Sequence, residues 1–402
     1  MPRARYIPAL LARHAEDLAF LWGQRRAALG SRLYRLRELN ELGERIEAHL
    51  QGLLVAPAAE LIERIDPALA TGDCDEAFAA AYALLRLADA GATQRVVVEF
   101  SRAGGGALTG LRDALSFAPP ALFVAEMQSA LAQAKPATAA AAAVVLANHR
   151  LLDASSSRLA ALVEHDDAHV AALAWRAAAA ADALGAAPTR AARPYAAALK
   201  HDDAALRRAA WWAAAWGGHA AVLPLLRERS REGDGVALEG LAVLGAAEDA
   251  PLVQQLVLAL QDGAVRCEVL ARYGHPMALN ALLRWMDPAA PALAAAAGEA
   301  FTRLTGHDVR GERRTLPVSD GADEFEREMA PAVWLPDVER ARALLERHGE
   351  HWAGGTRWCA GARVDSELDR EGLQRLDLEA RWDAAARAAF SGRPVCAPPP
   401  IV

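Results

Sequence analysis

The sequence predicts an all-α protein, built as a solenoid of stacked helix pairs with a helical cap at one end and a small helical module at the other. Two observations predict this fold: glycines recur at a near-constant spacing, and an Asp-led, Ala-rich apolar stretch precedes each of them. The glycines stand at 185, 217, 245 and 274, so the spacings are 32, 28 and 29 residues. A period in this range is typical of repeats that each form one pair of helices.

The clearest copy of the repeat begins at Asp202 and Asp203 and includes Leu206, Trp211 and the closing Gly217. An Asp side chain accepts a free backbone N–H of the first helical turn, so we expect Asp to cap each first helix. We expect Gly to end it, since Gly adopts the left-handed cap conformation without steric cost. Other copies begin at Asp166 or Asp167, at Asp234 and at Asp262. The second helices are expected over residues 222–226, 252–260 and 278–285.

The chain is expected to divide into four parts. Residues 1–70 form the N-terminal helical cap, because leucines recur there at helical spacing, and residues 71–308 form the repeat solenoid. Residues 309–336 are expected to be an exposed linker, rich in charge, Pro and Gly. Residues 337–402 form the C-terminal helical module, with one helix from Asp337 to Gly349, a second over 375–390 and a frayed tail.

Composition limits the classes of function. The chain of 402 residues has a formal net charge of −7 and a pI near 5.9, so we expect no nucleic-acid partner. Almost all positive charge is Arg, which favours bidentate contacts with carboxylates. Four scattered cysteines form no CxxC motif, which argues against a disulfide framework and fits a reducing cytoplasm. We expect no signal peptide and no membrane insertion, because no apolar stretch is long enough.

Motifs for catalysis are weak. His-Asp pairs occur at 165–166, 201–202 and 307–308, and capping explains the first two better than metal binding. Residues 348–351 bring two histidines and one acid together around Gly349, which predicts a surface turn. The glycines at 104–106 lack the other features of a phosphate loop and are expected to be a loop between repeats. We therefore predict no catalytic, cofactor-binding or metal-binding residue.

The candidate partner-binding residues fall into two groups. The first lies on the first helix of the clearest repeat, where Trp and Arg are common interface anchors. The second comprises polar residues on the expected second helices, which generally line the concave face of such solenoids. The ordinary alternatives are packing between repeats for the tryptophans and solvated positions for the polar residues. The candidates are Arg207, Arg208, Trp212 and Trp216 in the first group, and Arg227, Gln254, Gln255, Asn280 and Arg284 in the second.

The repeats resemble HEAT-like repeats of the short, Ala-rich type, which carry Val-Arg or Leu-Arg near the start of the first helix, as at 206–207 and 265–266. Further landmarks at 13–22, 44–53, 297–306 and 354–357 resemble a family of bacterial HEAT-like proteins whose genes often lie in type VI secretion clusters. The resemblance implies an accessory role, as an adaptor or chaperone for an effector or spike protein. It carries over no catalytic residue.

The leading hypothesis is a cytoplasmic, non-enzymatic scaffold or adaptor that binds a protein partner. The alternative is a HEAT-like enzyme, such as a DNA-repair glycosylase or a lyase-type cofactor handler. HEAT-like hydroxylases hold two irons with His-Glu pairs, and no His-Glu dipeptide occurs in this chain. A third possibility is a purely structural role within a larger assembly.

Overall fold

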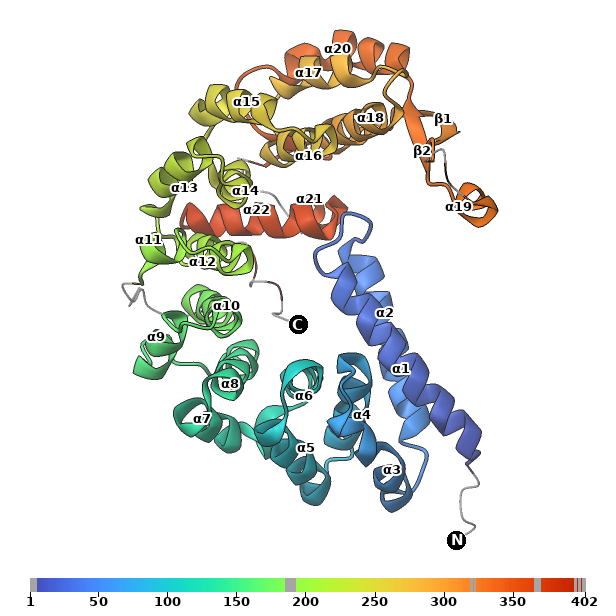
Figure 1. Ribbon diagram of the computed structural model, residues 1–402, viewed down its shortest axis with the longest axis vertical. Helices are drawn as coiled ribbons and strands as arrows, with labels where there is room; N and C mark the ends of the chain where they lie inside the picture. The colour runs from blue at the N-terminus through green and yellow to red at the C-terminus, as the bar shows by residue number, and fades with distance from the viewer. Residues whose placement is uncertain are drawn as a thin grey trace. The chain divides into compact units, whose positions relative to one another are not determined.

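The computed structural model describes residues 6–184, 193–318, 321, 323–364, 370–393, 396 and 399. These residues form 22 α-helices and four short β-strands, so the all-α prediction is confirmed (Figure 1). The chain divides into two compact units: unit 1 comprises residues 1–220 and 377–402, and unit 2 comprises residues 221–376. Within the described part of the chain, every helix is too short or too polar to cross a lipid bilayer.

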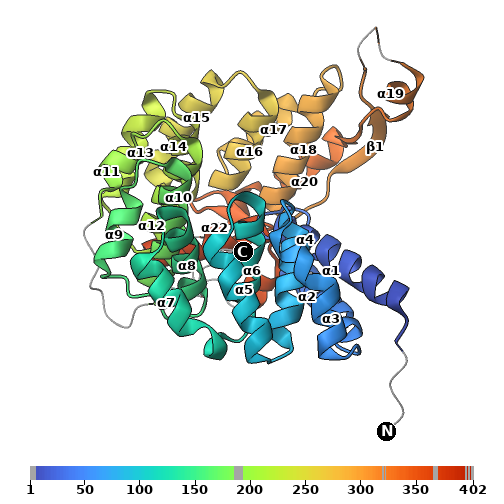
Figure 2. The ribbon, with the colours of Figure 1, turned by 60° about the horizontal axis from the view of Figure 1, so that its bottom comes forward.

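Unit 1 begins with the two helices predicted from the leucine pattern, α1 (Pro8–Ala28) and α2 (Leu36–Leu53), which pack against each other. Five later helices then pack in series, each against the next, and other helices connect them (Figures 1 and 2). The serial helices are α4 (Cys74–Arg86), α6 (Gly105–Phe117), α8 (Pro136–Asn148), α10 (Ala168–Leu184) and α12 (Ala204–Trp216). The connecting helices are α3 (Ala58–Ile65), α5 (Ala90–Arg102), α7 (Val124–Gln133), α9 (Ser157–Val163) and α11 (Tyr195–Ala198).

Small residues allow the serial helices to approach closely. A Cβ atom added to Gly110 of α6 would lie 2.2 Å from the carbonyl oxygen of Cys74 in α4, which is far inside van der Waals contact. Large aromatic side chains fill the neighbouring contact between α1 and α4, where Trp22 stacks on Phe78 with ring centroids 3.8 Å apart. Residues 138–147 of α8, which are Ala, Val, Leu and one Thr, are all buried. The Ala-rich composition is therefore used for close helix packing.

A helix from the far end of the sequence completes unit 1. α22 (Leu378–Phe390) packs against α12, and its first turns bind the turn between α1 and α2. The backbone N–H of Leu378 donates to the carbonyl of Tyr34 at 2.8 Å, and the indole N–H of Trp382 donates to the carbonyl of Leu29 at 2.8 Å. Residues 377–390 thus connect the first helices of unit 1 to α12 (Figure 1).

Unit 2 repeats the serial arrangement. α14 (Gly235–Leu244), α16 (Gly263–Tyr273) and α18 (Pro291–Thr305) pack one against the next, and each contacts the helix before it: α13 (Val222–Arg231), α15 (Ala250–Ala259) and α17 (Ala278–Trp285). α13, α15 and α17 lie where the three second helices were predicted, at 222–226, 252–260 and 278–285. α20 (Val338–Trp352) packs against α17, and α21 (Arg370–Arg375) follows β3 (Trp358–Cys359) and β4 (Ala362–Arg363).

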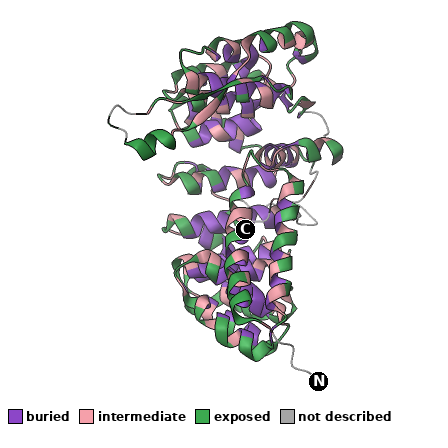
Figure 3. Cartoon of the chain, turned by 90° about the vertical axis from the view of Figure 1, so that its right-hand side faces the viewer, coloured by how far each residue is buried: buried purple, intermediate pink, exposed green. Residues whose placement is uncertain are grey.

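The segment expected to be a linker contains regular structure. β1 (Arg310–Thr315) and β2 (Ala332–Pro336) form an antiparallel pair with an irregularity between Arg310 and Arg313, and α19 (Glu324–Glu328) lies between them in sequence. Figure 3 shows α19 as exposed. The base of this excursion packs against α18, because Leu335 is buried and a Cβ on Gly298 of α18 would lie 2.8 Å from the Pro336 side chain.

The predicted helix starts are confirmed, but the predicted helix ends are only partly right. Asp203, Asp234 and Asp262 each accept a backbone N–H of the following first turn. Gly274 ends α16 in the left-handed conformation with φ of 74°. In contrast, the chain leaves α14 in an extended conformation at Gly245, and Gly217 keeps a helical φ while the next residue, also a glycine, turns left-handed. Residue 185 lies outside the described residues.

The expectation that Gly349 ends a helix is wrong. Gly349 lies inside α20, which continues to Trp352, so residues 348–351 are helical and do not form a surface turn. Trp352 is buried against Phe301 of α18, with ring centroids 6.4 Å apart. Packing of this last turn outweighs the roughly 1 kcal/mol by which an interior Gly weakens a helix.

Candidate functional site

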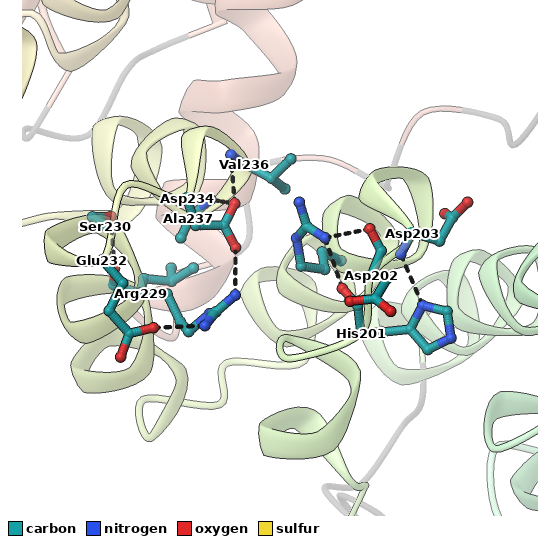
Figure 4. Close-up of polar contacts among 11 residues, drawn as sticks. His201, Asp202, Asp203, Arg229, Ser230, Glu232, Asp234, Val236 and Ala237 are labelled. Carbon is teal, nitrogen blue, oxygen red and sulfur yellow. Dashed lines mark hydrogen bonds and ion pairs between the residues drawn. The ribbon is translucent and has the colours of Figure 1, made fainter. Parts of the chain in front are cut away.

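The predicted site residues on α12 have different environments. The guanidinium of Arg207 donates to the carbonyls of His201 and Asp202, both at 2.7 Å, and so fixes the turn before its own helix (Figure 4). Arg208 is exposed. Trp212 is half-buried, whereas Trp216 is only 3% exposed.

The three tryptophans of α12 form a small aromatic cluster. Trp212 meets Trp211 and Trp216 edge to face, with ring centroids 5.5 and 5.9 Å apart. Trp211 and Trp216 are buried, so they pack the interior of unit 1 and offer little contact area to a partner. Of the three, Trp212 alone has accessible surface beside Arg208 on α12.

The polar candidates of the second group lie on α13, α15 and α17 of unit 2. Arg227 forms a bidentate ion pair with Asp249, with N–O distances of 2.7 and 2.8 Å. This hydrogen bonding raises the pKa of Arg227 above its ordinary value. Gln254 is half-buried, and three candidates are exposed: Gln255, Asn280 and Arg284. Arg227 is therefore already engaged by an internal acid, whereas the exposed three remain open to solvent.

The turn between α13 and α14 shows how the repeat starts are held (Figure 4). Arg229 pairs with Glu232 at 2.6 Å and with Asp234 at 3.4 Å. Asp234 also accepts the backbone N–H groups of Val236 and Ala237, at 3.0 and 3.3 Å. One carboxylate thus joins the end of α13 to the start of α14, and its chemistry is structural.

The histidines of the His-Asp pairs also act locally. His165 and His201 each accept, at Nδ1, the backbone N–H of the second Asp that follows, at 3.0 Å. His275 does the same for Met277 at 3.2 Å, where no Asp follows. The pattern therefore shapes the entry into a helix, and the capping residue is the second Asp of each run, Asp167 or Asp203. In the described ranges, no three His, Cys, Asp or Glu side chains converge as metal ligands.

Three large apolar side chains of the β1–α19–β2 excursion are exposed, although the linker prediction gives them no role. Phe325 is 68% exposed, Met329 67% and Trp334 46%. Phe325 and Met329 stand four residues apart along α19 and just past its end, so they lie on the same side of that turn. We call these three residues the apolar tip. The sequence signal for it is the presence of aromatic and Met residues among Asp323, Glu324, Glu326 and Glu328.

Comparisons with protein-family models, with curated proteins and with solved structures find no match to this chain.

Proposed function

We propose that the protein is a non-enzymatic scaffold or adaptor that binds a protein partner through the apolar tip of unit 2. The observation that carries this proposal is the exposure of Phe325, Met329 and Trp334 on one short excursion. Large apolar side chains exposed on one short segment favour an interaction site there, because water disfavours their exposure. Trp334 stands opposite Arg313 in the β1–β2 register, and Trp and Arg are frequent interface anchors.

The construction of the excursion supports a binding role. Its base is fixed to unit 2 by the buried Leu335 and by the backbone N–H of Asp337, which donates to the carbonyl of Val309 at 2.7 Å. The N–H of Leu316 donates to the carbonyl of Pro331 at 2.8 Å and closes the hairpin above the strands. These contacts hold β1 and β2 in place, so Trp334 of β2 is positioned before a partner binds, which favours affinity.

In this proposal the serial helices of each unit, with their connecting helices, are stacked HEAT-like pairs of a solenoid. The protein acts in the cytoplasm. The resemblance to proteins encoded in type VI secretion clusters makes an effector or spike protein the proposed partner. Arg208, Trp212, Asn280 and Arg284 remain predictions for additional contacts, since each has solvent-accessible surface.

Affinity purification from the source bacterium, followed by mass spectrometry, tests the proposal. The wild type is compared with a triple variant, Phe325→Gln, Met329→Gln and Trp334→Gln. Leu258→Gln is the matched control, because this leucine of α15 is also exposed, at 56%. We expect a protein partner with the wild type and the control, and its loss with the triple variant. Equal recovery with all three proteins would contradict the binding site, and a partner set without any secretion component would contradict the type VI association.

A further inference from the structure

The outer edge of β1 is an unpaired strand edge in the described part of unit 2. β1 belongs to a two-stranded antiparallel sheet, in which its partner is β2. β2 packs more extensively against α18 than β1 does, and five of the six β1 residues are exposed. An unpaired edge presents backbone N–H and C=O groups to which another extended chain can hydrogen-bond.

The register identifies which backbone groups of β1 face outwards. The N–H of Leu316 donates to the carbonyl of Pro331 at 2.8 Å, so these two residues form a hydrogen-bonded pair of the ladder. Hydrogen-bonded and non-hydrogen-bonded pairs alternate along an antiparallel ladder, which makes Arg313 and Thr315 members of non-hydrogen-bonded pairs. The backbone N–H and C=O groups of Arg313 and Thr315 therefore point away from β2.

The two ends of this edge differ. At Arg310 the backbone is already engaged, because its N–H donates to Asp308 at 2.9 Å and its carbonyl accepts from the guanidinium of Arg340 at 3.2 Å. The irregularity in register between Arg310 and Arg313 separates this end from the rest of the strand. At Arg313 and Thr315, no described residue bonds to the outward backbone groups. The open part of the edge thus runs from Arg313 to Thr315 and offers two N–H and two C=O groups.

The side chains at the open edge favour an acidic strand. Arg313 is exposed and forms no ion pair with a described residue, whereas Arg310 and Arg314 are each paired with a nearby acid, at 2.9 and 2.7 Å. Opposite charges on directly opposed residues stabilise an antiparallel pair, and like charges destabilise it. Pairing of two β1 strands about Arg314 would place this arginine opposite its own copy. Charge therefore disfavours a second copy of this chain as the occupant and favours a strand that carries acids.

We propose that an extended, acidic segment of the protein partner adds to β1 as a third, antiparallel strand. This inference rests on the proposed adaptor function and names the mode by which the excursion binds. An acidic residue opposite Arg313 would exchange two backbone hydrogen bonds with it and place its carboxylate on the same face of the sheet. Trp334 is directly opposed to Arg313, so this face also carries an exposed member of the apolar tip. In strand addition the backbone hydrogen bonds supply affinity, and the alternate side chains supply specificity.

Fluorescence anisotropy with the full chain and three labelled peptides tests the proposal. The first peptide consists of four Thr-Glu repeats, and the other two carry a methyl group on the backbone nitrogen of every Glu or of every Thr. The acid opposite Arg313 uses its own N–H, so we expect the N-methyl-Glu peptide to bind about tenfold more weakly than the N-methyl-Thr peptide. The two methylated peptides have the same charge and the same number of methyl groups, so charge alone would give equal binding.

Variants of the protein test the same edge from the other side. Thr315→Pro removes an outward N–H, and proline is tolerated where the N–H of an edge strand faces solvent. Thr315→Val keeps this N–H and is the matched control. We expect Thr315→Pro to weaken binding of the unmethylated peptide about tenfold and Arg313→Gln about fivefold. Arg64→Gln, at an exposed arginine of α3, should leave binding unchanged.

Three outcomes would overturn the inference: equal affinity of the two methylated peptides, equal affinity of Thr315→Pro and Thr315→Val, or equally tight binding of a peptide of four Thr-Lys repeats. Circular dichroism verifies the fold of the variants, and the methylated peptides test the wild type without any substitution. Sedimentation equilibrium covers the other occupant. A wild-type dimer that Thr315→Pro abolishes would identify a second copy on this edge and would also overturn the inference.

The adaptor function is judged separately by the affinity purification. A partner recovered equally with the wild type and Thr315→Pro, but lost with the triple variant of the apolar tip, would retain the adaptor function and refute strand addition. Peptide binding with the expected pattern, without recovery of any partner, would support the edge as a binding site for acidic strands and refute the adaptor function.

Discussion

Removal of the Arg357 side chain should destabilise unit 2 more than any other single arginine truncation there. Arg357 lies just before β3 and is 1% exposed. Its guanidinium donates to the carbonyls of Tyr273 at 2.6 Å and Val243 at 3.2 Å, and to those of Ala242 and Gly245. It also lies over the Tyr273 ring, 4.6 Å from the centroid. A positive charge at the C-terminal ends of α14 and α16 is favoured by the helix dipoles.

The size of the effect follows from these contacts. Four buried carbonyls lose a donor at about 1 kcal/mol each, and the cation–π contact adds about 1 kcal/mol. Relief of the guanidinium's desolvation offsets about 2 kcal/mol of this sum. We therefore expect Arg357→Ala to lower the free energy of unfolding by about 3 kcal/mol. Arg357→Met should lose nearly as much, because Met fills the volume but donates no hydrogen bond.

Urea denaturation of the full chain, followed by circular dichroism, measures the effect, and hydrogen exchange at the last turns of α14 and α16 locates it. Arg347→Ala is the control, because Arg347 is an exposed residue of α20. A loss below about 1 kcal/mol for Arg357→Ala, or a loss equal to that of the control, would refute the view that this arginine joins the two helix ends.

Three further predictions concern packing, capping and thiol reactivity. Gly110→Ala should lower the free energy of unfolding by about 1–3 kcal/mol, because its Cβ overlaps a carbonyl of α4. Gly43→Ala, with open space around it, should instead stabilise α2 by up to about 1 kcal/mol. Urea denaturation of the two variants measures both effects. Asp203→Ala should lower the free energy of unfolding by about 0.5–2 kcal/mol, because α12 loses its N-terminal cap. Asp202→Ala is the control, and an equal loss of stability for it in the same urea denaturation would contradict the capping role of Asp203. Burial raises the pKa of Cys267 to about 12, so its thiolate fraction at pH 8 is about 10⁻⁴ and becomes large only as the pH approaches 12. A disulfide reagent at pH 8 should leave Cys267 unmodified in the native protein and modify it in urea, and rapid native labelling seen by mass spectrometry would argue against this burial.

Local features of the fold could be predicted from the sequence. The aspartates that start α12, α14 and α16 act within three residues of their own position, so a short pattern contains the whole interaction. The helix at 278–285 is recovered with its bounds, because its apolar spacing and its neighbours agree. Gly349 misled the prediction because the packing of Trp352, which holds the last turn of α20, is not a local property.

Features that join distant segments could not be predicted in the same way. The acceptors of Arg357 lie 84 to 115 residues before it, and no periodicity links them. β1 has the sequence Arg-Gly-Glu-Arg-Arg-Thr, which shows no alternation of apolar and polar residues, so it gives no strand signal. Among the predicted site residues, Arg208 proved exposed and Trp216 buried, since helical periodicity alone does not identify which helix covers which face.

The contacts of α22 have a consequence for the order in which the chain folds. Leu29, Arg32 and Tyr34 find their partners at residues 378–382, about 350 positions later. During synthesis these contacts form only after residues 377–390 have left the ribosome, by which time the whole of unit 2 has emerged. Unit 2 is thus inserted between two segments of unit 1. Until α22 has been synthesised, the turn after α1 and one side of α12 are exposed on the nascent chain. Chaperone binding and misfolding at these surfaces compete with native folding.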